Sequence, residues 1–170
     1  MTMILSSPSV RHVVIGARFA GVKQLPNAER LKAEQAFLDS LDRLLVAGKN
    51  VVIVYPVPEL PKRHGVDGKL KSRVDKKGTK LVVMAREKFL AANRDLFQWL
   101  DNLQTRSELI RVYPHEVLCD QEYCYAAKYD EVYYFDQHHL SLTGAELVAP
   151  ALAAVLYDNQ SAEVGLKSQD

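Results

Sequence analysis

The chain has 170 residues, 48% of them hydrophobic and 25% charged, which suits one globular domain with a substantial core. Its 22 basic and 21 acidic residues leave a net charge of +1, which argues against a nucleic-acid partner or a membrane-surface role. No apolar run approaches the roughly 18 residues of a membrane helix, and residues 1–9 lack the charged start and apolar core of a signal peptide.

The first half of the chain alternates apolar strands with a helix. Val10–Ala17 and Val51–Tyr55 are short β-branched runs that predict buried strands. Between them, leucines repeat at helical spacing from Asn27, the expected N-cap, to about Ala47, and Gly48 is the expected residue just past the helix. Two apolar strands joined by a helix indicate a parallel sheet that is covered on both faces.

Residues 62–80 differ in composition from the rest of the chain. Pro56, Pro58 and Pro61 first end the preceding strand and stiffen its exit. The segment then holds eight Lys or Arg, three Gly and only two Asp. We predict an exposed basic loop inserted into a single domain, and the alternative is a contact to an anionic glycan or to another domain.

The second half continues the alternation of strands and helices. Leu81–Met84 predicts a brief strand or the start of a helix, and Arg86–Leu103 predicts a helix with an apolar stripe. Leu109–Tyr113 predicts a third strand. Pro114–Cys124 predicts a turn or a short helix that carries both cysteines.

The last elements enclose the most distinctive stretch of the chain. The aromatic run Val132–Phe135 predicts a final buried strand, with Tyr125–Ala127 as a possible hairpin partner. The last helix is expected from Ser141, a good N-cap residue, to about Tyr157, with a kink at Pro150.

The polar tail at residues 159–170 is expected to fray. The order of elements predicts an α/β fold, namely a three-layer sandwich with a mainly parallel sheet, over a single domain that spans residues 1–170.

Asp136 and His139 form the candidate catalytic pair. They lie in the loop between the last predicted strand and the last helix, where open α/β sheets place their chemistry. A carboxylate on one imidazole nitrogen fixes the tautomer and leaves the other nitrogen to take a proton from a nucleophile. The alternative is a polar helix-start cluster in which Asp136 caps the helix and His139 is solvated.

The other candidate site residues carry weaker signals. Arg18 ends the first strand, where it predicts either a surface ion pair or a contact to an oxyanion or substrate. A metal site at His138 does not fit the spacing of structural zinc sites, so we expect no metal. His12, His64 and His115 have no organised partners in the sequence, and we expect them to be structural or solvated.

Four residues separate Cys119 from Cys124. This spacing, without a second pair of ligands, is poor for zinc. Two unrelated buried thiols and a local disulfide remain as alternatives, and a disulfide would indicate an oxidising compartment.

The segment YFDQHHLS at residues 134–141, followed by Gly144 and Ala145, resembles the last conserved block of SGNH hydrolases. The resemblance is closest to the periplasmic SGNH domains that are fused to membrane acyltransferases and O-acetylate surface polysaccharides. The segments VVIVYPVPEL at 51–60 and VVIGARF at 13–19 are similar to strands of that family, and the likeness covers roughly residues 10–157.

This resemblance implies a flavodoxin-like fold and a disulfide between Cys119 and Cys124. It also implies a serine nucleophile in a Gly-Asp-Ser block, which the chain does not contain. Only about nine residues precede the strand at Val10, so the first strand-helix unit is expected to be missing. The serines at positions 6, 7 and 9 have no strand before them and are not expected to act as nucleophiles.

The function that the resemblance implies is transfer of an acetyl group to or from a sugar hydroxyl through an acyl-serine. His139 would take and return the proton, and Asp136 would orient the imidazole of His139. No metal or organic cofactor would be needed. The implied partners are a carbohydrate acceptor and a membrane acyltransferase domain, and the implied location is periplasmic or otherwise extracytoplasmic. A non-catalytic SGNH-like module that binds a glycan or a partner protein is the alternative.

Overall fold

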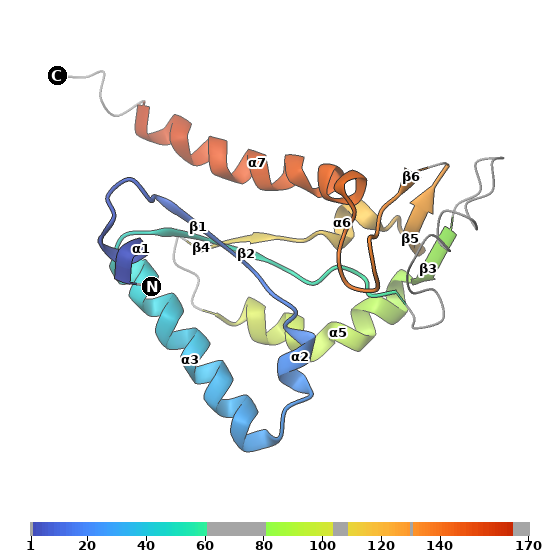
Figure 1. The fold of residues 1–170 in the computed structure, drawn as a ribbon, viewed down its shortest axis with the longest axis horizontal. Helices are drawn as coiled ribbons and strands as arrows, with labels where there is room; N and C mark the ends of the chain where they lie inside the picture. The colour runs from blue at the N-terminus through green and yellow to red at the C-terminus, as the bar shows by residue number, and fades with distance from the viewer. Residues whose placement is uncertain (1, 61–80, 104–108, 130, 165–170) are drawn as a thin grey trace. The chain divides into compact units, whose positions relative to one another are not determined.

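The computed structural model describes residues 2–60, 81–103, 109–129 and 131–164 (Figure 1). The predicted basic loop at 62–80 lies outside these residues. The chain divides into two compact units, one formed by residues 1–56 and 93–113 and the other by residues 57–92 and 114–170. Each unit is described by itself.

The first unit is built on a parallel three-stranded sheet. Its strands are β1 (His12–Gly16), β2 (Asn50–Val54) and β4 (Leu109–Val112), in the order β1-β2-β4. The register pairs His12 with Asn50 and Val51 with Leu109. This confirms an α/β fold with a mainly parallel sheet, as the apolar, β-branched runs predict.

Three helices and part of a fourth belong to the same unit. They are α1 (Thr2–Ser6), α2 (Ala20–Lys23), α3 (Asn27–Val46) and the second half of α5 (Arg86–Asp101). In Figure 1, α3 is the long helix between α2 and β2. Leucines of α3 and α5 pack with β2 in one core: Leu41, Leu44, Leu45, Val51, Ile53, Tyr55, Leu96 and Leu100.

The ends of α3 show one error and one success of the sequence prediction. Pro26, not Asn27, occupies the N-cap, and no side chain caps this end. The backbone carbonyl of Pro26 accepts the first helical hydrogen bond, from Arg30 at 2.9 Å, so the helix already includes Asn27. Gly48 follows the helix with a φ of 69°, as predicted, because a left-handed residue at this point favours glycine.

Asp101 and Arg111 attach the end of α5 to the sheet. The hydroxyls of Tyr55 and Tyr113 donate to Oδ1 of Asp101 at 2.7 and 3.2 Å. The guanidinium of Arg111 donates to the carbonyl of Leu103 at 3.2 Å, which places a cation at the carboxyl end of the helix.

The second unit contains a small antiparallel sheet. Its strands are β3 (Leu81–Ala85), β5 (Tyr123–Lys128) and β6 (Glu131–Val132), in the order β3-β5-β6. The helices of this unit are α6 (His115–Leu118) and α7 (Leu142–Val164), together with the first half of α5. Among the described helices, none combines the length and the apolar content needed to cross a bilayer.

The aromatic run Val132–Phe135 is not a full buried strand, so that prediction is wrong in part. It pairs with β5 as a hairpin, but the strand β6 covers only Glu131–Val132. Tyr133 and Tyr134 are buried, whereas Phe135 is 76% exposed. The chain turns after Tyr134 because Tyr134 pairs with Leu140 and closes a loop between them.

Ser141 and Gly144 fix the start of α7. The Oγ of Ser141 accepts from the backbone N–H of Gly144 at 3.1 Å and donates to the carbonyl of Val132 at 2.6 Å. This confirms Ser141 as the N-cap. The helix includes Pro150 and continues to Val164, beyond the predicted end near Tyr157.

Gly144 lies so close to the backbone of Tyr133 that no side chain fits there. A Cβ at this position would lie 2.0 Å from the carbonyl oxygen of Tyr133. Since both groups belong to backbone that other hydrogen bonds already hold, the first turn of α7 would have to move away.

We therefore expect Gly144→Ala to lower the free energy of unfolding by about 3 kcal/mol, the upper part of the usual cost of overpacking. Urea denaturation measures this loss. Gly21→Ala is the matched control, because a Cβ there meets nothing within 4 Å. Equal stability of the two variants would contradict the close packing at Gly144.

Candidate functional site

A tight loop between β6 and α7 carries the predicted catalytic pair. The backbone N–H of Phe135 donates to the carbonyl of His139 at 2.9 Å, next to the bridge between Tyr134 and Leu140. The two ends of the loop are therefore held side by side, and Asp136 lies between them in the chain.

The carboxylate of Asp136 binds three donors of this loop. Its Oδ1 accepts from the backbone N–H groups of His138 and His139, each at 2.8 Å. Its Oδ2 lies 2.7 Å from Nδ1 of His139. These bonds lower the pKa of Asp136 to about 2, with the N–H of His138 as the largest cause and the imidazole of His139 next.

His139 is held by one nitrogen and open at the other. Because Nδ1 faces a carboxylate, the neutral imidazole carries its proton on Nδ1, and Nε2 keeps a free lone pair. The side chain is 75% exposed, so a reactant can approach it. The structure thus brings Asp136 and His139 together as predicted. The alternative, in which Asp136 caps the last helix, is not observed, because Ser141 is the cap.

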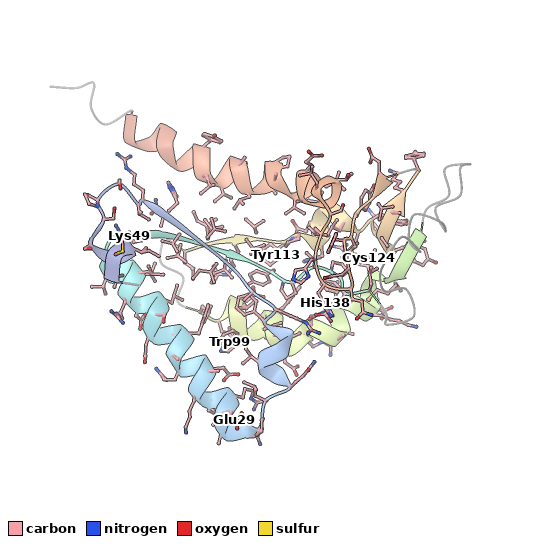
Figure 2. The ribbon with its side chains drawn as sticks, viewed as in Figure 1. Glu29, Lys49, Trp99, Tyr113, Cys124 and His138 are labelled. Carbon is pink, nitrogen blue, oxygen red and sulfur yellow. A yellow bond between two sulfur atoms is a disulfide. The ribbon has the colours of Figure 1, made fainter. Side chains whose placement is uncertain are left out.

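The proline-rich segment after β2 supports the loop from outside. The backbone N–H of Leu60 donates to the carbonyl of Gln137 at 2.9 Å. Oε2 of Glu59 lies 3.4 Å from Nδ1 of His138, within ion-pair distance of a protonated imidazole but without the geometry of a hydrogen bond. Figure 2 labels His138. The sequence does not single out Glu59, although the three prolines mark the segment that carries it.

Cys119 and Cys124 form a disulfide, the alternative that the family resemblance favours. Figure 2 labels Cys124, and the bridge joins the residue after α6 to β5. The two cysteines also pair as an isolated antiparallel bridge, so sulfur and backbone close the same short turn.

Asp120 organises that turn in the way that Asp136 organises its own loop. Its Oδ1 accepts from the backbone N–H groups of Glu122 and Tyr123 at 2.9 and 2.8 Å. The hydroxyl of Tyr125 donates to Oδ2 of Asp120, and this bond raises the pKa of Tyr125 to about 12. The sequence does not single out Asp120, because the pattern of an aspartate turn is common.

The remaining predicted residues lie apart from this loop in the chain. Arg18 follows β1 and belongs to the first unit, whereas Asp136 belongs to the second, so its contact to an oxyanion remains a prediction. His115 is buried against Phe89, with ring centroids 5.5 Å apart, and burial lowers its pKa. Nε2 of His12 lies 3.3 Å from the side-chain amide of Asn50. His64 lies outside the described residues.

Within the described ranges, no three His, Cys, Asp or Glu side chains gather as ligands for a metal ion.

Two of the three N-terminal serines contact each other. The Oγ atoms of Ser7 and Ser9 lie 2.9 Å apart and form a hydrogen bond.

Comparison with known proteins identifies one protein family. The family model described as "SGNH domain (fused to AT3 domains)" matches residues 2–154. No curated protein and no solved structure matches the chain.

The low pKa of Asp136 gives a direct test of the loop geometry. Its pKa is lowered from 3.8 to about 2, so the bonds stabilise the fold fully above about pH 4 and this contribution is lost as the pH falls through 2. NMR titration of the Asp136 carboxyl carbon should give a midpoint near 2.

His139→Ala should raise this midpoint only in part, because the backbone N–H groups remain. His138→Ala should leave it nearly unchanged, since only the backbone of His138 binds Asp136. A midpoint near 3.8 in the unmodified protein would refute the geometry.

The disulfide should stabilise the second unit. A closed loop of this size contributes about 2 kcal/mol in the chain-entropy description. We expect Cys119→Ala/Cys124→Ala to lower the free energy of unfolding by about that amount, measured with urea. Reduction of the unmodified protein should cause a similar loss. Two reactive thiols in the non-reduced, denatured protein would show that the bridge is absent.

Proposed function

Because this chain belongs to the family of SGNH domains fused to AT3 domains, we propose that it takes part in moving an acetyl group to or from a sugar hydroxyl of a cell-surface polysaccharide. Membership of the family supports an acyltransferase-like or esterase-like role and a membrane acyltransferase partner domain. The observation that carries the catalytic role is the 2.7 Å contact between Asp136 Oδ2 and His139 Nδ1.

The proposed reaction uses His139 as the base and then as the acid. Its Nε2 takes the proton of a serine hydroxyl while the serine oxygen attacks the carbonyl carbon of the acyl donor. The donor oxygen then leaves with that proton, and an acyl-serine remains. In the second half, His139 takes the proton of the acceptor hydroxyl, which attacks the ester, and returns it to the serine.

The Asp136 carboxylate serves this cycle in two ways. It holds the proton of neutral His139 on Nδ1, and it stabilises the imidazolium that forms in each half-reaction. Its low pKa keeps it ionised throughout the pH range in which an imidazole can act as a base. Arg18 is proposed as a further donor to the oxyanion.

The serine is the part of the site that the sequence does not supply in a recognisable form. No Gly-Asp-Ser occurs in the 170 residues. We propose that these residues carry the acid-base half of the site and that the serine comes from another segment or chain. The same observation favours the second candidate function, a non-catalytic SGNH-like module that binds a glycan or a partner protein.

The proposed location is extracytoplasmic. Disulfides persist in oxidising compartments, and Cys119 and Cys124 form one. The acyl donor would then reach the site from the membrane acyltransferase domain.

Hydrolysis of 4-nitrophenyl acetate by the chain tests the acid-base role, with water as the attacking nucleophile because the serine is proposed to come from another segment or chain. A positioned base accelerates such reactions by about 10² or more, so His139→Ala should lower the rate by roughly that factor. Asp136→Asn should lower it as well, because the amide leaves the imidazole in the wrong tautomer.

His12→Ala is the control, because His12 lies in the first unit, where its Nε2 is 3.3 Å from the side-chain amide of Asn50. A fluorophosphonate probe should not label the chain if the serine is supplied from outside. If His139→Ala and the unmodified chain hydrolyse the ester at equal rates and the probe labels neither, the catalytic proposal is wrong. The second candidate function, a non-catalytic binding module, would then take its place.

A further inference from the structure

The Nε2 atom of His139 has the properties of a nucleophile as well as those of a base. The carboxylate of Asp136 lies 2.7 Å from Nδ1 and keeps the ring proton there, so the neutral imidazole carries its lone pair on Nε2. The side chain is 75% exposed. Histidine is among the side chains that form covalent intermediates. An acyl donor that reaches this loop therefore meets an exposed lone pair.

The side chains next to His139 in the chain are less available for such a reaction. Ser141 is the serine nearest to His139 in the sequence, and its hydroxyl already donates to a backbone carbonyl and accepts from a backbone N–H. The imidazole of His138 is 29% exposed, and its buried Nδ1 lies 3.4 Å from the carboxylate of Glu59. His139 is therefore the most accessible nucleophile of the three.

Asp136 favours the formation of a covalent bond at Nε2. Such a bond places a positive charge on the ring, and the carboxylate against Nδ1 stabilises this charge as it develops. The pKa of Asp136 is lowered to about 2, so the carboxylate is ionised when the imidazole is neutral. Two backbone N–H groups already hold the carboxylate in place. Little reorganisation is therefore needed when the bond forms.

We propose that His139 accepts an acyl group on Nε2 and passes it on, which makes the chain an acyl carrier without the use of a serine. The class of donor is an activated acyl compound, such as an aryl ester or a thioester. The leaving groups of these donors depart as weakly basic anions, which a neutral imidazole can displace. The choice of acetyl as the acyl group rests on the proposed function, whereas the chemistry at Nε2 requires no serine.

The carrier cycle has two steps. In the first, the lone pair of Nε2 forms a bond to the carbonyl carbon of the donor, and the bond from that carbon to the leaving group breaks. The Nδ1 proton passes through Asp136 to solvent and neutralises the leaving anion, so a neutral acyl-imidazole remains. In the second, the oxygen of water or of an acceptor hydroxyl attacks the acyl carbon. The electron pair of the broken C–N bond returns to the ring, and the proton of the acceptor returns to Nδ1.

Pre-steady-state kinetics of the full chain with 4-nitrophenyl trimethylacetate tests this inference, because the bulky acyl group slows the second step. We expect a burst of about one equivalent of 4-nitrophenolate per chain, which is the kinetic fingerprint of an acyl intermediate. Mass spectrometry of the intact chain should show one added acyl group. Hydroxylamine should remove this group, since it cleaves an acyl-imidazole but not the amide that an acylated amine would form.

His139→Ala should abolish the burst. Asp136→Asn should slow it about tenfold or more, because the amide leaves the imidazole in the wrong tautomer. His12→Ala is the matched control and should keep the full burst, because His12 lies in the first unit beside the amide of Asn50. Thermal melting of the three variants separates a loss of reactivity from a loss of folding.

The inference is overturned if no burst occurs, if the burst persists in His139→Ala, or if the acyl group resists hydroxylamine. The burst reports bond formation at Nε2, whereas steady-state hydrolysis reports the slowest step by either route. Hydrolysis that depends on His139 but shows no burst would therefore overturn the acyl carrier and leave the acid-base role intact. A burst that depends on His139 would support the carrier even if no polysaccharide accepts the acyl group.

Discussion

The Asp136 carboxylate is the constraint on which the functional loop depends. One side chain satisfies two backbone N–H groups and the imidazole of His139. The loop shape and the orientation of the imidazole therefore have the same cause. Loss of the carboxylate charge would release the backbone and the histidine together, and this coupling explains why a surface loop can hold a side chain that is 75% exposed.

The surrounding chain fixes this loop at three points. Ser141 and Gly144 hold the start of α7 against the backbone of Tyr133. On the other side, Leu60 binds the carbonyl of Gln137. Each contact is made by the backbone or by a short side chain, and such groups have little freedom to move. The positions of Asp136 and His139 are therefore well defined. An acid-base pair built in this way loses little entropy when a reactant binds.

The loop at Asp136 presents an exposed imidazole whose Nδ1 is held by the carboxylate, an arrangement that suits proton transfer at Nε2.

The sequence by itself determined the parallel strands, the helix from Asn27 and the pairing of Asp136 with His139, because each follows from local spacing or from a turn within four residues. It also favoured the disulfide, through the family resemblance at residues 134–141. It was wrong at the ends of two elements: the run Val132–Phe135 shortens because Tyr134 pairs with Leu140, and Pro26 takes the cap expected of Asn27. Only the tertiary structure decided that Glu59 meets His138, because that contact joins residues far apart in the chain, which no local pattern encodes.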